Sequence, residues 1–403
     1  MSQTGFDEPT LERLADLVVG FAANVQEGQI VTIGAELGKE EMVRALASSA
    51  YRHGARFVDV SYLDLHVKRE RILHAREEYL DFVPSWFGER LLALGDQRCA
   101  RIGLTGPADP HVLEGLDPAR AGRDQFPFLK ETGKLVDERT TNWTALPCPT
   151  RAWARLVHPD LDDDAALARL CEQLLHVCRL DEADPIAAWR ERQEVLVGAA
   201  QRLSERRFDA LRYTGPGTDL TIGLLGTSTW QAAAFETVDG LRHMPNLPSE
   251  EIFTSPDPER THGVVRSTKP LVLSGTIIRG LEVEFDRGRA VRIDADENAE
   301  VLRGYAARDD GAARLGEVAL VDGQGRIGAL DTVFFDTLLD ENAASHIALG
   351  ASFAFTAGEQ DRERLNSSAI HVDFMIGGEG VDVTGVTPDG DEMPVLVDGE
   401  WRV

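Results

Sequence analysis

The chain has 403 residues, of which 43% are hydrophobic and 27% are charged, and its formal net charge is −26. A chain of that length is too long to fold around one ordinary hydrophobic core, which favours two domains. The composition is that of a globular protein. The acidic excess would repel phosphates, so we expect no nucleic-acid partner. No apolar run approaches the length of a membrane span, so we expect no membrane insertion.

The first five residues lack the basic and apolar regions of a secretory signal, which predicts a cytoplasmic protein. Four cysteines, none of them in a CxxC pair, favour reduced thiols. Cys171, His176 and Cys178 share one segment, but its leucines follow helical spacing and the three residues match no zinc pattern. We therefore interpret this segment as part of a helix core.

Helical and strand-like stretches alternate along the first half of the chain. The pattern predicts helices at 10–25, 40–52, 86–94, 162–180 and 184–206, and strands at 29–33, 56–60 and 100–105. Such alternation implies a parallel sheet that is covered on both faces. The fingerprints GxGxxG and Walker A are missing, so nucleotide binding is not expected. We predict an α/β N-terminal domain with a largely parallel sheet over residues 1–205.

The texture changes after residue 205, where short β runs follow one another at hairpin spacing. These predicted strands cover 211–214, 220–225, 264–265, 271–278, 281–285, 290–294 and 369–376. Helices are predicted at 332–339 and 342–350. We predict that residues 206–403 form an α+β, β-rich C-terminal domain.

Six acids and histidines stand beside small or turn-forming residues in the C-terminal part of the chain. They are Glu251, Glu317, Glu341, His346, His371 and Asp373. Carboxylates balance the charge of divalent metals, and neutral imidazole suits zinc or iron. Six groups exceed the needs of one tetrahedral ion and suit two ions that share a carboxylate, an arrangement that hydrolyses amides or phosphates.

Two of these positions carry additional information. Glu317 follows a glycine and precedes the apolar run 318–321, so its carboxylate would be partly buried, which is costly unless it is paired or bound to metal. His371 and Asp373 are two residues apart in a predicted strand and project from one face. Each residue by itself also fits an ordinary core or surface position, and the residues alone support a metal site and its absence equally.

Several longer motifs make the sequence recognisable. They are Asn246-Leu247-Pro248-Ser249-Glu250-Glu251-Ile252-Phe253-Thr254, Gly316-Glu317, Asp340-Glu341-Asn342-Ala343-Ala344-Ser345-His346-Ile347-Ala348-Leu349-Gly350 and His371-Val372-Asp373, with weaker support from Trp143, Pro147-Cys148-Pro149-Thr150 and Trp153-Ala154. Through them the chain resembles the thermophilic metallo-aminopeptidases, the M29 or aminopeptidase T family. The resemblance covers most of the chain.

This resemblance implies a two-domain homodimer that acts on peptides with a free N-terminus. It places two divalent ions (Zn, Co, Mn or Mg) in the C-terminal domain, where they activate a water. The family's ligands fall on Glu251, Glu317, Glu341, His346, His371 and Asp373. Glu317 takes the place of the bridging carboxylate, and Glu251 is chosen over Glu250 because the family's ligand precedes an apolar residue and Phe or Tyr. The catalytic positions are then Glu317, Glu251 and Phe353.

Phe353 departs from the family pattern, in which a tyrosine usually follows the histidine of the His346 motif by seven positions. That hydroxyl is associated with the metal centre, and phenylalanine has none. Two further hypotheses therefore stay open. Relatives of this fold include mononuclear-iron dioxygenases that open dihydroxypyridine rings and retain a Glu and an HxD pair, and a non-catalytic or repurposed member would also explain Phe353.

Overall fold

The computed structural model describes residues 4–124, 126–127, 130–232 and 234–402. Contacts divide them into two compact units: the described residues within 1–192 and 234–249 (unit 1), and those within 193–233 and 250–403 (unit 2). The boundary near residue 205 stays a prediction, because compactness does not test which segments fold independently. Within the described ranges, no helix is both long and apolar enough to cross a bilayer.

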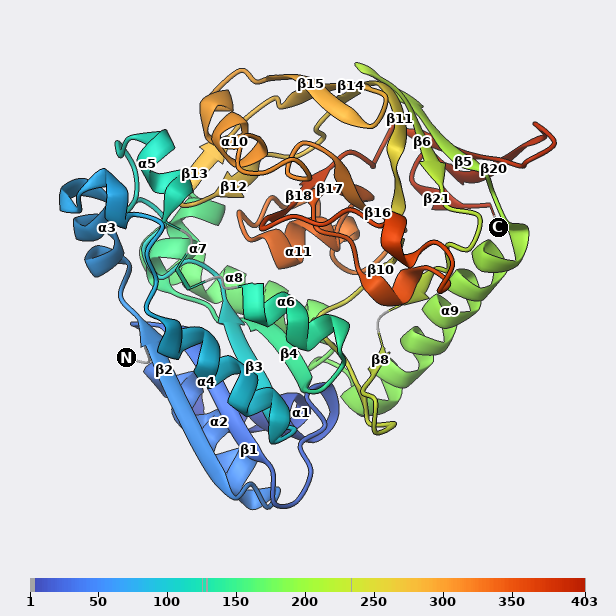
Figure 1. Ribbon diagram of the computed structural model, residues 1–403. Helices are drawn as coiled ribbons and strands as arrows, with labels where there is room; N and C mark the ends of the chain where they lie inside the picture. The colour runs from blue at the N-terminus through green and yellow to red at the C-terminus, as the bar shows by residue number, and fades with distance from the viewer. Residues whose placement is uncertain (1–3, 125, 128–129, 233, 403) are drawn as a thin grey trace. The chain divides into compact units, whose positions relative to one another are not determined.

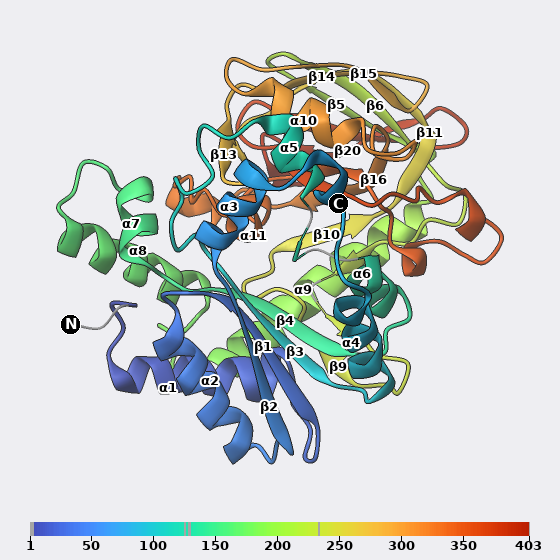
Figure 2. The same ribbon diagram turned by 60° about the vertical axis from the view of Figure 1, so that its left-hand side comes forward.

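Unit 1 contains a four-stranded parallel sheet with the order β2-β1-β3-β4. Its strands are β1 (Ile30–Glu36), β2 (Phe57–Leu63), β3 (Ala100–Thr105) and β4 (Asn142–Pro147). In Figure 2, α1 (Glu8–Leu17) and α2 (Glu40–Arg52) lie along one face of the sheet and α4 (Ser85–Asp96) along the other. The predicted α/β fold with a covered parallel sheet is therefore confirmed.

Further elements complete unit 1. They are the π-helical turn η1 (Val18–Ala22), α3 (Leu65–His74), α5 (Pro118–Arg123), α6 (Lys130–Asp137), α7 (Arg151–Val157), α8 (Asp163–Val177) and the hairpin of β8 (Phe235–Glu236) and β9 (Arg242–His243). Asp162 caps α8 by accepting from the amides of Asp164 and Ala165. Cys171 and Cys178 are buried at this helix, in agreement with a helix core.

The two edges of the parallel sheet differ. Beyond β4, the Ala145 amide donates to the Pro245 carbonyl at 2.7 Å, and the Leu247 amide donates to the Ala145 carbonyl at 2.9 Å. This segment therefore covers the β4 edge. In the described part of the chain, β2 pairs with β1 alone, so its outer edge has no strand partner.

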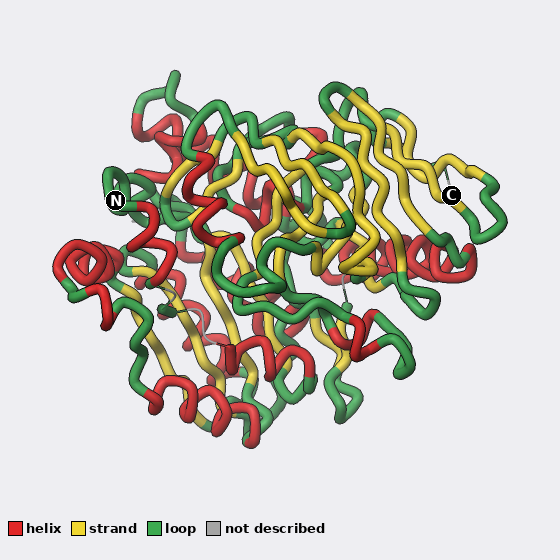
Figure 3. The backbone as a smooth tube through the Cα atoms, turned by 45° about the horizontal axis from the view of Figure 1, so that its top comes forward, coloured by secondary structure: helices red, strands yellow, loops and turns green. Residues whose placement is uncertain are grey.

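Unit 2 is built from two main antiparallel sheets, with strands in yellow in Figure 3. The larger has the order β15-β14-β11-β6-β5-β19-β20-β21. Its strands are β5 (Ala210–Gly215), β6 (Thr218–Leu224), β11 (Pro256–Arg266), β14 (Glu282–Asp286), β15 (Arg289–Asp294), β19 (Asp382–Val386), β20 (Glu392–Val397) and β21 (Glu400–Trp401). One hydrophobic core joins this sheet to the smaller one, and α9 (Pro185–Arg206) adds Leu196 and Leu203 to it.

The smaller sheet has the order β18-β17-β16-β10-β7. Its strands are β7 (Gln231–Ala232), β10 (Glu251–Thr254), β16 (Leu315–Val321), β17 (His346–Gly350) and β18 (His371–Met375). The helices α10 (Ala299–Ala306) and α11 (Thr337–Glu341) also belong to unit 2.

Several predictions for the C-terminal half are wrong in detail. The predicted helix at 332–339 is α11, which begins at Thr337 and ends at Glu341. The predicted helix at 342–350 is a turn followed by β17, whose five residues are all buried. The predicted single strand at 271–278 is a hairpin of β12 (Leu271–Leu273) and β13 (Thr276–Ile278). Ser274 and Gly275 reverse the chain there with φ angles of 48° and 70°.

Candidate metal centre

The smaller sheet of unit 2 gathers acidic and histidine side chains on one face. Antiparallel partners project from the same face, and residues two apart on a strand do so as well. Glu317 lies opposite Ala348, which lies opposite Asp373. The same register relates the remaining members of this face, Glu251, His346 and His371. Five of the six predicted residues therefore share a face. They lie on β10, β16, β17 and β18, which are labelled in Figure 1.

A bulge in β16 presents Glu317. The pairing register of β16 with β17 shifts between Leu315 and Glu317. A Cβ atom added at Gly316 would lie 2.2 Å from the Ala351 carbonyl oxygen, so only glycine allows this close approach. The glycine before Glu317, noted in the sequence, is thus a steric requirement of the site.

Glu341 reaches the same face from α11. Asp336 caps this short helix by accepting from the Leu339 amide at 3.3 Å, and Asp340 accepts from the Phe334 amide at 2.8 Å. Glu341 is the last helical residue, and the following turn leads into β17 at His346.

The side chains of this cluster lie within short distances of one another. His346 Nε2 lies 3.1 Å from Glu251 Oε2 and 4.0 Å from Glu317 Oε1. His371 Nε2 lies 3.0 Å from Glu317 Oε2 and 3.4 Å from Asp373 Oδ1. The two oxygens of Glu317 therefore face two different histidines, as the carboxylate of a bridging ligand would.

Backbone carbonyls fix the orientation of both imidazole rings. His346 Nδ1 lies 2.9 Å from the Glu341 carbonyl oxygen, and His371 Nδ1 lies 2.8 Å from the Ala351 carbonyl oxygen. A carbonyl can only accept, so Nδ1 carries the proton in each ring. Each Nε2 then faces carboxylate oxygens, and this contact needs either a second proton or a cation. Histidine ligands of metals are held in this way.

Burial and neighbouring charges set the pKa values of the cluster. Burial raises the pKa of Glu341 well above its usual range, and Asp373 and Glu251 raise it further. Burial also raises the pKa of Glu317. For His346, burial favours the neutral ring, but the hydrogen bond and charge of Glu251 prevail and raise its pKa to about 10. The cluster thus has an excess of negative charge that positive charge must balance.

The donor set fits divalent metal. Three groups of residues each offer ligand atoms within 4.8 Å of one another: Glu251 with Glu317 and His346, Glu317 with His371 and Asp373, and Glu341 with His346 and Asp373. Oxygen and imidazole nitrogen donors of this kind suit zinc, manganese and cobalt. The structure thus brings all six predicted residues together.

Of the two adjacent glutamates, Glu251 belongs to these groups, whereas Glu250 does not. Phe353 lies beside the cluster, with its ring centroid 5.2 Å from that of His371. It also packs against Phe253 at 5.4 Å and Phe355 at 5.5 Å. Phe253 shares the sheet face of Glu251 because the two residues are two apart on β10. The same spacing in the sequence could have placed Phe253 beside the site.

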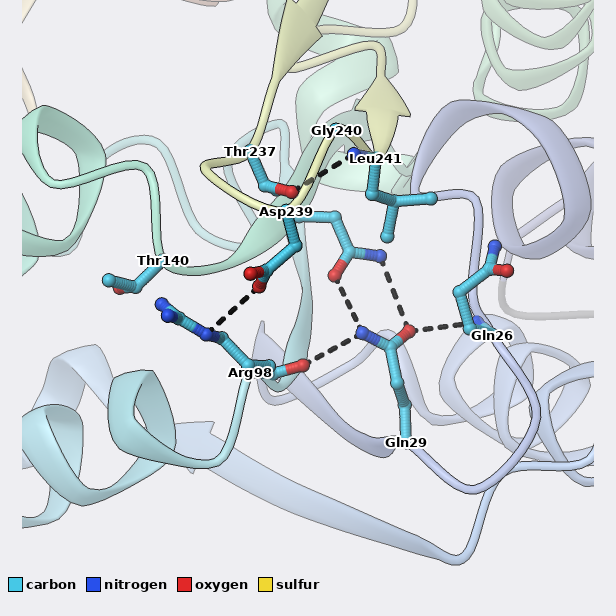
Figure 4. Close-up of a pocket in the computed structure, with 9 residues that line it drawn as sticks. Gln26, Gln29, Arg98, Thr140, Thr237, Asp239, Gly240 and Leu241 are labelled. Atoms are coloured by element: carbon cyan, nitrogen blue, oxygen red, sulfur yellow. Dashed lines mark hydrogen bonds and ion pairs between the residues drawn. The ribbon is translucent and has the colours of Figure 1, made fainter.

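A pocket of about 350 Å³ lies elsewhere, in unit 1 (Figure 4). Its polar groups bond to one another: Gln29 Nε2 donates to Asn142 Oδ1 at 2.9 Å, and Arg98 pairs with Asp239 at 3.0 Å. Gln29, Arg98 and Thr140 lie one or two residues before β1, β3 and β4, at the amino ends of these strands. Parallel sheets bind ligands at the carboxyl ends of their strands. We assign this pocket no part in the chemistry.

The family model for thermophilic metalloproteases (M29) matches residues 7–401. The chain belongs to this family. Aminopeptidase T from Thermus aquaticus is 42% identical over 98% of both chains, and aminopeptidase PepS from Streptococcus thermophilus is 35% identical over 98% of both. The recognised resemblance is thereby confirmed, and this M29 member is a metal-dependent peptide-bond hydrolase.

Solved structures support the fold of this M29 chain. Wild-type AmpT from Thermus thermophilus superposes with a TM-score of 0.88 at 41% identity, covering 98% of this chain and 100% of that one. A 2,5-dihydroxypyridine dioxygenase from Pseudomonas putida KT2440 superposes with a TM-score of 0.55 at 13% identity, covering 98% of each chain. The second likeness shows a shared fold alone.

Proposed function

We propose that this protein releases the N-terminal residue of peptides with a metal-activated water. One observation carries the proposal. Six donor side chains converge at one sheet face, in a chain that is 42% identical to aminopeptidase T over 98% of its length. The acidic cluster also suits a substrate with a positively charged α-amino group.

We propose two divalent ions, Zn, Co, Mn or Mg, with Glu317 as the carboxylate between them. The support is geometric: each Glu317 oxygen faces a different histidine, and two of the three donor groups contain this residue. The first ion would take Glu251 and His346, and the second His371 and Asp373. Glu341 would complete the set beside His346 and Asp373.

Bound ions would polarise the scissile carbonyl and lower the pKa of a water toward neutrality. The chain's residues supply the remaining functions. Glu317 holds the spacing of the site, and the carbonyls of Glu341 and Ala351 hold His346 and His371 in one tautomer. Glu251 is the carboxylate that we assign to moving the water's proton to the leaving amine.

The dioxygenase hypothesis has weaker support. A mononuclear iron site needs three protein ligands and open positions, whereas three overlapping donor groups are present here. The dioxygenase with the same fold is 13% identical. The repurposed hypothesis depends on Phe353 alone.

Activity and metal content should be measured together. The protein is stripped of metal with a chelator, each metal is restored in turn, and the bound ions are counted by elemental analysis. Turnover is measured with aminoacyl-anilides whose amino group is either free or N-acetylated. We expect two ions per chain and turnover of the free forms only. One iron with consumption of oxygen and a dihydroxypyridine would establish the dioxygenase, and inactivity with every metal would establish a repurposed member.

We also propose a homodimer in which two copies meet at the free edge of β2. Both faces of this strand are exposed: Phe57 is 57% exposed, and Val60 and Tyr62 on the other face are 37% and 43% exposed. Of the fifteen large apolar side chains exposed among the described residues, nine lie within 51–90. A bare apolar edge strand tends to pair with another strand.

Charge favours a second copy as the partner of β2. The chain carries a net charge of −26, so copies repel each other over most of their surface, but residues 51–90 contain seven basic and seven acidic side chains. A two-fold axis through Val60 would place Asp59 opposite Ser61, so like charges would not meet.

A cytoplasmic location is the last part of the proposal. Its support is that all four cysteines are buried and unpaired, as in a reducing compartment. Cell fractionation tests it.

A further inference from the structure

Asn342 is a buried amide between two segments that carry candidate ligands. Its side chain has no solvent exposure. Asn342 Oδ1 accepts from the Glu250 amide at 2.6 Å, and Asn342 Nδ2 donates to the Leu338 carbonyl at 2.9 Å. The same Nδ2 lies 3.5 Å from Glu341 Oε1. One side chain thus contacts the backbone next to Glu251, the body of α11 and the carboxylate of Glu341.

These contacts need an amide specifically. An amide places a donor and an acceptor on two separate atoms of one uncharged side chain, whereas a serine or threonine hydroxyl carries both on a single oxygen. Aspartate would offer no donor to the Leu338 carbonyl and would repel Glu341, and leucine would leave the Glu250 amide without its acceptor. The joined segments are 92 residues apart in the chain, so local structure does not fix their spacing.

A second buried amide shows the contrast. Asn366 Nδ2 donates to the Gly311 carbonyl at 2.8 Å and the Gly350 carbonyl at 2.6 Å, and so joins a turn to the end of β17. The Asn366 side chain contacts backbone carbonyls, whereas Asn342 lies against a carboxylate of the cluster and beside the residue that precedes another.

We propose that Asn342 is a positioning residue that sets the relative placement of the Glu251 and Glu341 carboxylates. This inference rests on the proposed metal site. Partners that orient metal ligands typically change metal affinity by about 10–100-fold when they are removed. Asn342 acts through the ligands and does not touch the reacting atoms.

The test is a metal titration of the full-length protein with Co²⁺ and Zn²⁺ against a competing chelator. The variants are Asn342→Leu, which matches the size of the side chain, and Asn342→Ala, which leaves room for water if the leucine variant does not fold. Gln173→Leu is the matched control, because Gln173 is a buried amide of unit 1 bonded to His158 at 2.8 Å. Unfolding midpoints are measured without metal, and the Co²⁺ absorption spectrum reports ligand geometry.

We expect both Asn342 variants to weaken metal binding about 10–100-fold and to alter the Co²⁺ spectrum. Gln173→Leu should lower the unfolding midpoint and leave the metal Kd and spectrum unchanged. An unchanged Kd and spectrum in a folded Asn342 variant would overturn the inference while leaving the metal site intact. Failure of the unmodified protein to bind either metal would overturn the proposed site and this inference together.

Discussion

Glu317 illustrates how much one side chain can control in this protein. It is 5% exposed, it sits at a bulge that only glycine at the preceding position permits, and its two oxygens face two histidines. A buried carboxylate is costly unless positive charge accompanies it. The sequence context of Glu317 indicated burial, and the structure adds the reason for its orientation.

We expect Glu317→Gln to leave the fold intact and to reduce bound metal below two ions per chain. Turnover should fall on the order of 10²-fold or more, which is the effect of losing one group that stabilises charge in the transition state. The amide removes the negative charge that would hold two cations close together. The measurement is elemental analysis with anilide turnover. Asp257→Asn is the control, because Asp257 is a buried carboxylate that pairs with Arg364 outside the cluster. Two ions and near-normal turnover in Glu317→Gln would exclude the bridging role.

Phe353 is the position at which this chain departs from the family pattern. We expect Phe353→Tyr to raise peptidase turnover about tenfold or more, because the added hydroxyl would place a donor near the charge developing on the carbonyl oxygen. Phe355→Tyr is the control, since that ring lies 5.5 Å from Phe353 and adds the same hydroxyl elsewhere in the aromatic group. Equal turnover in the parent and Phe353→Tyr would show that the ions alone stabilise this charge.

Protonation of His243 makes the folding stability of unit 1 depend on pH. Burial among Trp143 and Phe235 lowers the pKa of this ring to about 4, opposed in part by the Leu241 backbone. The pKa is near 6.5 in the unfolded chain, so the unfolded state binds the proton first, and stability is lost as pH falls from about 6.5 to about 4. The loss is on the order of 3 kcal/mol at 1.36 kcal/mol per pKa unit.

We expect His243→Phe to remove most of that pH-dependent loss, because phenylalanine fills the same space and takes up no proton. Denaturant unfolding of parent and variant at pH 7 and pH 4 measures it, with hydrogen exchange at β4 and β9 to locate the effect. Identical pH dependence in the two proteins would mean that His243 keeps an ordinary pKa in the folded state.

At the scale of elements, the two edge strands of the parallel sheet, β2 and β4, differ in whether another segment covers them. The segment at 245–247 covers β4, whereas β2 has no strand partner among the described residues. Edge strands of soluble proteins usually carry charges, prolines or bulges that prevent pairing. Asp59 is the only charged residue of β2, and it already pairs with Arg90.

We expect Val60→Lys to convert a dimer to a monomer, because a two-fold axis through this residue would bring two lysines together in the paired strands. Light scattering after size-exclusion chromatography measures the mass. Val291→Lys is the control, since Val291 is 57% exposed on β15 in unit 2. A monomeric parent, or a Val60→Lys variant that stays dimeric, would refute the β2 interface.

The segment 342–350 shows why the type of an element can be misjudged from sequence. Its alanines favour a helix, and short apolar runs do not distinguish a buried helix from a buried strand. Pairing with β16 on one side and β18 on the other decides in favour of a strand. The same pairing sets His346, His371 and Glu317 on one face, which a helix at this position would not have done.

At the scale of the whole molecule, metal binding should stabilise the two units differently. We expect metal at 100 times its Kd to raise the free energy of opening unit 2 by about 2.7 kcal/mol, because a ligand stabilises only the state that binds it. Hydrogen exchange with and without chelator should show slower exchange at β16–β18 and little change at β1–β4. Equal protection of both units, or protection that persists in Glu317→Gln, would contradict a metal site confined to unit 2.

The sequence by itself determined the family, the α/β character of unit 1 and the identities of the six clustered side chains. These follow from local patterns: alternating elements, the HxD pair, and the glycine before Glu317. Such signals depend on neighbouring residues, and the chain retains them in any conformation.

Tertiary structure alone decided which residues meet. The strand at His346, the shared face of five candidate ligands and the bond between Glu250 and Asn342 all join segments that are far apart in the chain. Their formation depends on sheet register and buried hydrogen bonds, which outweigh local propensity once the core has assembled. No local sequence pattern shows whether these tertiary contacts outweigh local propensity, so only the folded structure shows which residues meet.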